Sequence, residues 1–158
     1  MAGKSGCRSR WRWLLLPPAL LLGLWIPGNV AVTVTPSVRR RIFWLTAPRY
    51  HLADGDYLLF EMKDPWSGRA RDRIIKEIGC APGEMLENRG PDYYCDGRFL
   101  GRALAADSTG AQLPRFVFHG RVPADRFFMM GDHPRSYDSK YFGFISRERI
   151  RARAVPLL

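Results

Sequence analysis

The pattern of apolar and polar residues changes character about a quarter of the way along the chain. Residues 13–38 carry no charge and are rich in leucine, and this stretch exceeds the roughly 20 residues needed to cross a bilayer. We therefore predict a basic head over residues 1–12, a transmembrane signal anchor over 13–34 and an exterior domain over 35–158. A cleavable signal peptide is the alternative, but Asn29 stands where cleavage after Ala31 would need a small residue.

Beyond the anchor, short apolar runs alternate with turn residues, and no long run of helical period appears. This pattern predicts a mainly β domain. An Asp-Gly pair inside "PDYYCDGRFLG" predicts a two-residue hairpin. The other predicted strands are "DYLLFEM" at 56–62, "DRIIKEIG" at 72–79, "RFVFHGRV" at 115–122, "DRFFMMGD" at 125–132 and "RERIRARAVPLL" at 147–158.

Charge is distributed unevenly along the chain. The formal net charge is +10, but eight of the 25 basic residues precede Asp54 and no acid does, which leaves 17 bases against 15 acids. Basic residues on both sides of an apolar segment favour membrane lipids as partners rather than nucleic acid. The positive-inside rule favours an N-terminus inside the cell, so that the domain faces outward.

The cysteines indicate no metal site and no cofactor. Cys7 lies in the basic head, whereas Cys80 and Cys95 belong to the exterior domain, where a disulfide can persist. A Cys80–Cys95 disulfide is therefore possible. Two buried free thiols are the alternative.

The polar loop "MMGDHPRSYDSKYFGF" at 129–144 invites a hydrolytic triad built on Asp132 and His133. Adjacent residues of an extended chain point to opposite faces, so these two side chains cannot easily form the required relay. The chain also lacks a Gly-x-Ser-x-Gly elbow. We interpret His133, which precedes Pro134, as a turn residue.

A serine can instead be activated by a neutral lysine, which requires burial of the lysine among apolar groups. Lys4 lies in the basic head, Lys63 lies beside Asp64 and Lys140 lies in the polar loop. Lys76 alone is embedded in an apolar strand. The alternative is an ordinary outward-facing lysine on an edge strand.

Four short motifs occur in order: "TPSV" at 35–38, "GDYLLF" at 55–60, "KEIGCAPGE" at 76–84 and the polar loop. This series resembles signal peptidase I, a membrane-anchored Ser/Lys endopeptidase, over about residues 33–60, 74–84 and 122–156. The Thr-Pro-Ser order is more similar to TraF-type conjugative-transfer peptidases, which mature pilin precursors. The resemblance implies a signal-peptidase-like β domain behind one transmembrane helix, in the inner membrane and facing the periplasm.

The resemblance also implies roles for individual residues. Ser37 would be the nucleophile, Lys76 its general base and Thr35 a donor to the oxyanion. The polar loop would hold the lysine amine in place through Ser136, which hydrogen-bonds the amine, with support from Asp132, Asp138 and Lys140.

The chain departs from the family pattern at four positions. Arg39 replaces a proline and Arg41 a glycine, so the loop facing the substrate is altered. Glu77 stands where the family usually has a basic residue, but a strand would point it away from its neighbour Lys76. Lys140 replaces an arginine and loses the planar fork that grips a carboxylate.

Thr33 offers a rival register, because it stands three residues before Pro36, as the nucleophile does in ordinary signal peptidases. Ser37 is preferred, since that register leaves a hydroxyl at Thr35 for the oxyanion.

The resemblance implies a leader peptidase that cleaves exported precursors, a pilin being the favoured example, after small residues at −1 and −3. One alternative is a catalytically impaired structural member of a pilus or secretion apparatus. A self-cleaving repressor-type Ser/Lys protease is a further alternative, but it would need a DNA-binding helix pair in place of the apolar segment.

Overall fold

The computed structural model describes residues 29–33, 40, 42–62 and 72–157. The chain divides into two units, residues 1–30 and 31–158, and the features below belong to the second apart from Val30. In the part of the chain that is described, no helix has the length and apolar character needed to cross a membrane. Most of the predicted anchor, residues 13–28, lies outside the described residues.

The end of the predicted anchor requires a correction. Val30–Val32 forms strand β1, which joins the main sheet beside β2, so these residues are not part of a helix that continues to residue 34. The physical reason is the pairing with β2, which the two β-branched valines favour.

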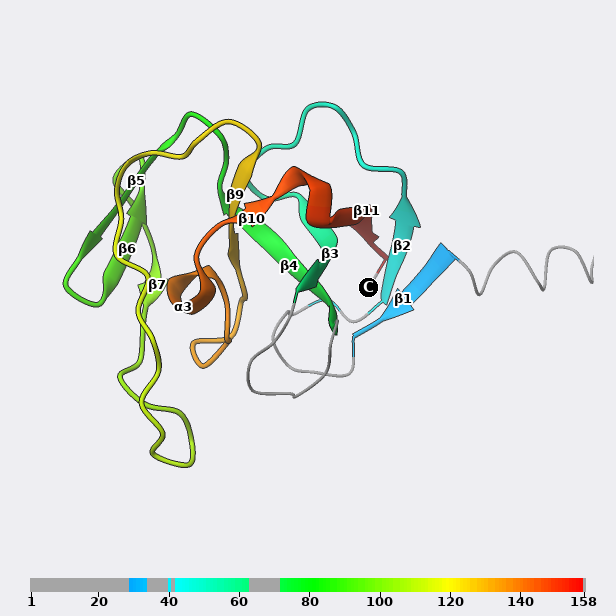
Figure 1. Cartoon of the computed structure of the whole chain (residues 1–158). Coiled ribbons are helices and arrows are strands. Elements are labelled where there is room, and N and C mark those ends of the chain that lie inside the picture. Colours follow the sequence, from blue (N-terminus) through cyan, green and yellow to red (C-terminus); the bar gives the residue numbers. More distant parts are fainter. Residues whose placement is uncertain (1–28, 34–39, 41, 63–71, 158) are drawn as a thin grey trace, which may run out of the picture. The chain divides into compact units, whose positions relative to one another are not determined.

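A seven-stranded sheet contains the strands in the order β1-β2-β11-β3-β4-β9-β10 (Figure 1). From β2 to β10, each strand pairs antiparallel with its neighbours. The members after β1 are β2 (Ile42–Thr46), β3 (Tyr57–Met62), β4 (Asp72–Cys80), β9 (Arg126–Met130), β10 (Ile145–Ser146) and β11 (Ile150–Pro156).

A smaller sheet has the order β7-β6-β5-β8. Its strands are β5 (Met85–Arg89), β6 (Asp92–Cys95), β7 (Arg98–Arg102) and β8 (His119–Arg121). Asp96 and Gly97 link β6 to β7 with φ values of 45° and 79°, the left-handed pair that a tight hairpin requires. The Asp-Gly prediction is therefore confirmed.

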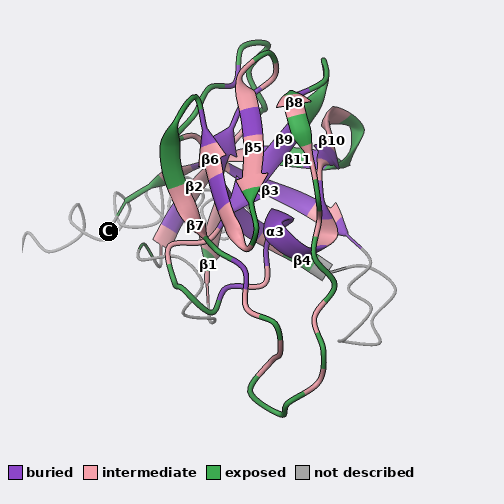
Figure 2. Ribbon diagram, turned by 90° about the vertical axis from the view of Figure 1, so that its left-hand side faces the viewer, coloured by how far each residue is buried: buried purple, intermediate pink, exposed green. Residues whose placement is uncertain are grey.

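Buried residues concentrate on β3, β4 and β9, whereas the long connection from β7 to β8 is mostly exposed or intermediate (Figure 2). β4 is apolar on both faces because each face meets a different cluster. Ile78 packs with Leu58 and Phe60 on one side, and Ile75 packs with Phe43 on the other. A strand covered on both sides explains the continuous apolar run in its sequence.

The mainly β prediction is confirmed, with differences in detail. The predicted strand over 115–122 shortens to β8, and the polar loop contains a short helix, α3 (Ser139–Phe142), that was not expected. Asp138 caps this helix by accepting a hydrogen bond from the Lys140 N–H, which is the local reason for a helical turn in so polar a segment. A 3₁₀ turn, η1 (Arg147–Arg149), precedes β11.

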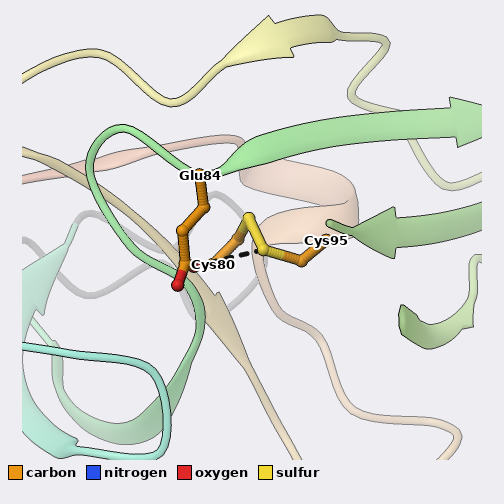
Figure 3. A group of neighbouring side chains, drawn as sticks. All are labelled: Cys80, Glu84 and Cys95. Atoms are coloured by element: carbon orange, nitrogen blue, oxygen red, sulfur yellow. Dashed lines mark hydrogen bonds between the residues drawn. A yellow bond between two sulfur atoms is a disulfide. The ribbon is translucent and has the colours of Figure 1, made fainter. Parts of the chain in front are cut away.

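Cys80 and Cys95 form a disulfide that joins the end of β4 to the end of β6 and thereby links the two sheets (Figure 3). Their Cα atoms lie 5.6 Å apart. Glu84 lies beside the bridge, and its carboxylate accepts a hydrogen bond from the Ala81 N–H over 2.6 Å. Among the described residues these three form the one cluster with metal-ligand chemistry, but sulfur atoms bonded to each other are not thiolate ligands.

Candidate active site

Lys76 lies on an interior strand of the seven-stranded sheet, because β4 pairs with β3 on one side and β9 on the other. Its register partner on β3 is Leu58, which is fully buried. The Lys76 side chain is itself only 2% exposed. The alternative of an outward-facing lysine on an edge strand is therefore wrong.

Burial lowers the pKa of the Lys76 amine from 10.5 to about 8. The positive charge of Lys140 acts in the same direction, whereas the carboxylates of Asp138 and Asp132 oppose the change. At pH 7 an amine with this pKa is neutral in about one molecule in ten, against roughly one in three thousand for an exposed lysine. Such an amine can accept a proton from a nearby hydroxyl group.

Ser136 holds this amine in place. Lys76 Nζ donates a hydrogen bond of 2.5 Å to Ser136 Oγ, across 60 residues of sequence. Ser136 is 4% exposed, and its own N–H donates to the carbonyl of His133 over 2.8 Å. The structure thus brings together the lysine and the serine that the resemblance paired.

Asp138 ties both ends of the same loop to a buried cation. Its Oδ2 accepts hydrogen bonds from Lys140 Nζ at 2.6 Å and from the Gly131 N–H at 3.2 Å. Asp138 is fully buried and Lys140 is 2% exposed, so the ion pair is shielded from water. The Asp138 carboxylate therefore closes the loop by accepting from the Gly131 N–H, and the Lys140 ammonium neutralises its buried charge.

The side chain of His133 has no place in this arrangement. Its side chain is exposed, and its Nδ1 accepts a hydrogen bond from the Arg135 N–H over 3.1 Å. These contacts agree with its interpretation as a turn residue.

Two further residues support the site and were not found from the sequence. The buried Ser139 Oγ accepts a hydrogen bond from the Met129 N–H over 2.8 Å, which fastens α3 to β9. Tyr93 donates from its hydroxyl to the Lys140 carbonyl over 3.0 Å. No local pattern marks Tyr93, because its partner lies 47 residues away.

Glu77 occupies the other face of β4, beside its register partner Tyr57. Burial raises the pKa of the Glu77 carboxyl, and a hydrogen bond with the Asp132 carboxylate raises it further, while the Tyr57 hydroxyl lowers it by donating to the carboxylate. Asp132 therefore interacts with Glu77 on this face as well as with the charge of Lys76.

Ser37, Thr35, Arg39 and Arg41 lie outside the described residues. The rival nucleophile Thr33 is described, and its Oγ1 donates a hydrogen bond to the Arg40 carbonyl over 3.1 Å. This bond joins the residues on either side of segment 34–39, which contains the Thr-Pro-Ser motif.

Comparisons with known proteins agree on one family. The profile described as "Signal peptidase, peptidase S26" matches residues 26–158. The chain is 30% identical over 112 residues to a "Probable signal peptidase I-2" of Synechocystis sp., covering 66% of this chain and 49% of that protein. It is 31% identical over 107 residues to a "Signal peptidase I" of Leptolyngbya laminosa, covering 64% and 50% respectively.

The chain thus spans about half the length of the curated relatives that it matches. Among solved structures, a signal peptidase I from Enterococcus faecalis is 25% identical, with a TM-score of 0.42, and the match covers 68% of this chain and 98% of that one.

Proposed function

Because the chain belongs to the signal peptidase family, peptidase S26, we propose that it is a serine endopeptidase that removes leader peptides from exported precursors. The observation that carries the proposal is the buried Lys76 amine, which has a pKa of about 8 and is hydrogen-bonded to Ser136. Burial of a lysine amine costs stability even when the amine is hydrogen-bonded, so a chemical role accounts for the presence of Lys76 in an apolar strand.

In the proposed reaction, Ser37 Oγ attacks the scissile carbonyl and the neutral Lys76 amine takes the hydroxyl proton. The Thr35 hydroxyl and the Ser37 N–H donate to the oxyanion that forms. The resulting ammonium returns its proton to the leaving amine, which leaves an acyl-enzyme on Ser37. The Lys76 amine then takes a proton from water, or from another amine, as this second nucleophile attacks the acyl group, and it returns the proton to Ser37 Oγ when the acyl group is released.

The substrate is proposed to be a precursor with small residues at −1 and −3, and a pilin for conjugative transfer is the favoured example. The Thr-Pro-Ser order at 35–37 supports this choice. The uncharged stretch at 13–38 supports a single-pass anchor in the inner membrane with the catalytic domain in the periplasm.

Cleavage of a precursor in membranes that contain the full chain tests the proposal. Ser37→Ala and Lys76→Ala should each abolish cleavage, whereas Lys63→Ala, to which we assign no role, should not. Thr33→Val separates the two registers. Loss of activity in Thr33→Val with retention in Ser37→Ala would assign the nucleophile to Thr33.

A catalytically impaired structural protein is the second candidate, because Arg39 and Arg41 replace the proline and glycine of the family pattern. A wild-type chain that inserts and folds but cleaves no precursor would favour it. Arg39→Pro combined with Arg41→Gly should then restore cleavage.

A further inference from the structure

A pocket of about 440 Å³ lies next to the loop that holds Ser136. One wall belongs to this loop and to α3, through Arg135, Tyr137 and Tyr141. The other wall belongs to the long connection between β7 and β8, through Leu104, Asp107 and Leu113. Nothing in the chemistry proposed above uses this pocket.

The loop that lines the pocket also contacts Lys76. Ser136 turns its hydroxyl toward Lys76 Nζ, while the residues on either side of it, Arg135 and Tyr137, line the pocket. The pocket is therefore lined by the immediate chain neighbours of the residue that contacts the amine.

Both walls of the pocket are held in position without a ligand. Tyr141 Oη accepts a hydrogen bond from the Leu104 N–H over 2.9 Å, which ties the two walls to each other. The rings of Tyr137 and Tyr141 stack with centroids 5.4 Å apart and an angle of 9°. The Leu113 N–H donates to the Ala105 carbonyl over 2.9 Å, which closes the long connection upon itself. A preformed wall loses little conformational entropy when a ligand binds.

The chemistry of the walls selects an uncharged apolar group. Two leucines and two stacked tyrosines supply apolar surface. Arg135 disfavours a cationic side chain. Asp107 disfavours an anionic one, because hydrogen bonds from Thr109 hold its carboxylate in the charged form.

We propose that this pocket is a specificity subsite that binds an apolar or aromatic side chain of the precursor on the C-terminal side of the cleaved bond. The inference rests on the proposed function. The leaving amine must receive its proton from Lys76, so the chain that follows the bond passes the Lys76 amine and Ser136. The neighbours of Ser136 line the pocket, and this places the pocket on the leaving side.

The test uses the full chain in detergent micelles and peptides with alanine at −1 and −3 and glycine from +1 to +4. A single residue, leucine, phenylalanine, lysine or aspartate, is placed at each of these four positions in turn, and kcat/KM is measured. We expect leucine or phenylalanine at one of the positions to raise kcat/KM roughly tenfold over glycine, with no gain from lysine or aspartate.

Two variants assign the preference to this pocket. Leu113→Glu should reduce the leucine-to-glycine ratio to about one, whereas Gln112→Glu adds the same charge at a neighbouring residue outside the pocket and should keep the ratio. If Leu113→Glu does not fold, Arg135→Glu, at an exposed position, should raise the kcat/KM of the lysine peptide over that of the aspartate peptide about tenfold.

The outcomes are distinguishable. Equal cleavage of all peptides by the wild-type chain would overturn the subsite and leave the proposed function standing. A preference that survives both Leu113→Glu and Arg135→Glu would overturn the assignment to this pocket. A wild-type chain that cleaves none of the peptides would overturn the proposed function and this inference together.

Discussion

The buried Lys76 ammonium should lower the stability of the protein at neutral pH, and Lys76→Met measures by how much. The folded protein releases the Lys76 proton near pH 8, whereas the unfolded chain keeps it until about pH 10.5. Since the unfolded state binds more protons between these values, the stability contributed by this residue rises with pH across the window from 8 to 10.5. Below pH 8 the full cost of the buried charge is present.

The two pKa values differ by about 2.5, and each unit corresponds to about 1.36 kcal/mol, so the buried charge costs about 3 kcal/mol below pH 8. Methionine has a similar unbranched shape without the charge, but it loses the hydrogen bond to Ser136, worth about 1 kcal/mol. Lys76→Met should therefore be more stable than the wild type by about 2 kcal/mol at pH 7. Above pH 10.5 the order should reverse, with the wild type ahead by about 1 kcal/mol.

The assay is urea unfolding of both proteins at several pH values from 6.5 to 11, without reductant. Both proteins also carry Ser37→Ala, which prevents them from digesting themselves during the assay. Burial also raises the pKa of Tyr93 to about 12, but this group contributes equally to both proteins and cancels in the difference. A stability difference that stays constant from pH 7 to 10 would refute the lowered pKa of Lys76 and the general base built on it.

Three other predictions concern Ser136, Lys140 and the disulfide. Ser136→Ala removes an acceptor that stabilises the ammonium, so the rising limb of kcat/KM, which is set by deprotonation of Lys76, should move to lower pH while the maximal rate falls roughly tenfold. Lys140→Met leaves the Asp138 carboxylate buried and unpaired, which should cost about 3 to 5 kcal/mol in urea unfolding. Reduction of the Cys80–Cys95 disulfide, which closes a loop of 15 residues, should cost about 3 kcal/mol of stability.

Each of these has a control. If the rising limb of the pH profile of kcat/KM stays in place in Ser136→Ala, the serine does not contact the ammonium. The double variant Asp138→Asn with Lys140→Met should recover part of the stability lost in Lys140→Met, and no recovery would argue against an unpaired charge as the cause. Alkylation without reductant followed by intact-mass analysis should label neither Cys80 nor Cys95.

The sequence alone determined the features that depend on a few neighbouring residues. The Asp-Gly pair specified the hairpin between β6 and β7, because only left-handed backbone closes so short a turn. The apolar neighbours Ile75 and Ile78 marked Lys76 as the lysine suited to burial, and β4 is indeed covered on both faces. Turn composition was enough to interpret His133.

Hydrophobic pattern failed where a specific hydrogen bond or strand pairing decides the conformation. Val30–Val32 was assigned to the anchor because it continues an apolar run, but pairing with β2 makes it a strand. The helix α3 depends on Asp138, whose carboxylate caps the helix and at the same time binds the Lys140 ammonium and the Gly131 N–H. Periodicity cannot reveal such a network.

The site itself was decided by the tertiary structure. Motif order implied that Lys76 and Ser136 cooperate, but only the pairing of β4 with β9 brings them within 2.5 Å across 60 residues. The pKa of the Lys76 amine has the same origin, since burial by strands from distant parts of the chain, rather than its neighbours in sequence, removes water from it. A sequence can specify which residue types are available for chemistry, whereas desolvation and distance exist only once the sheet has assembled.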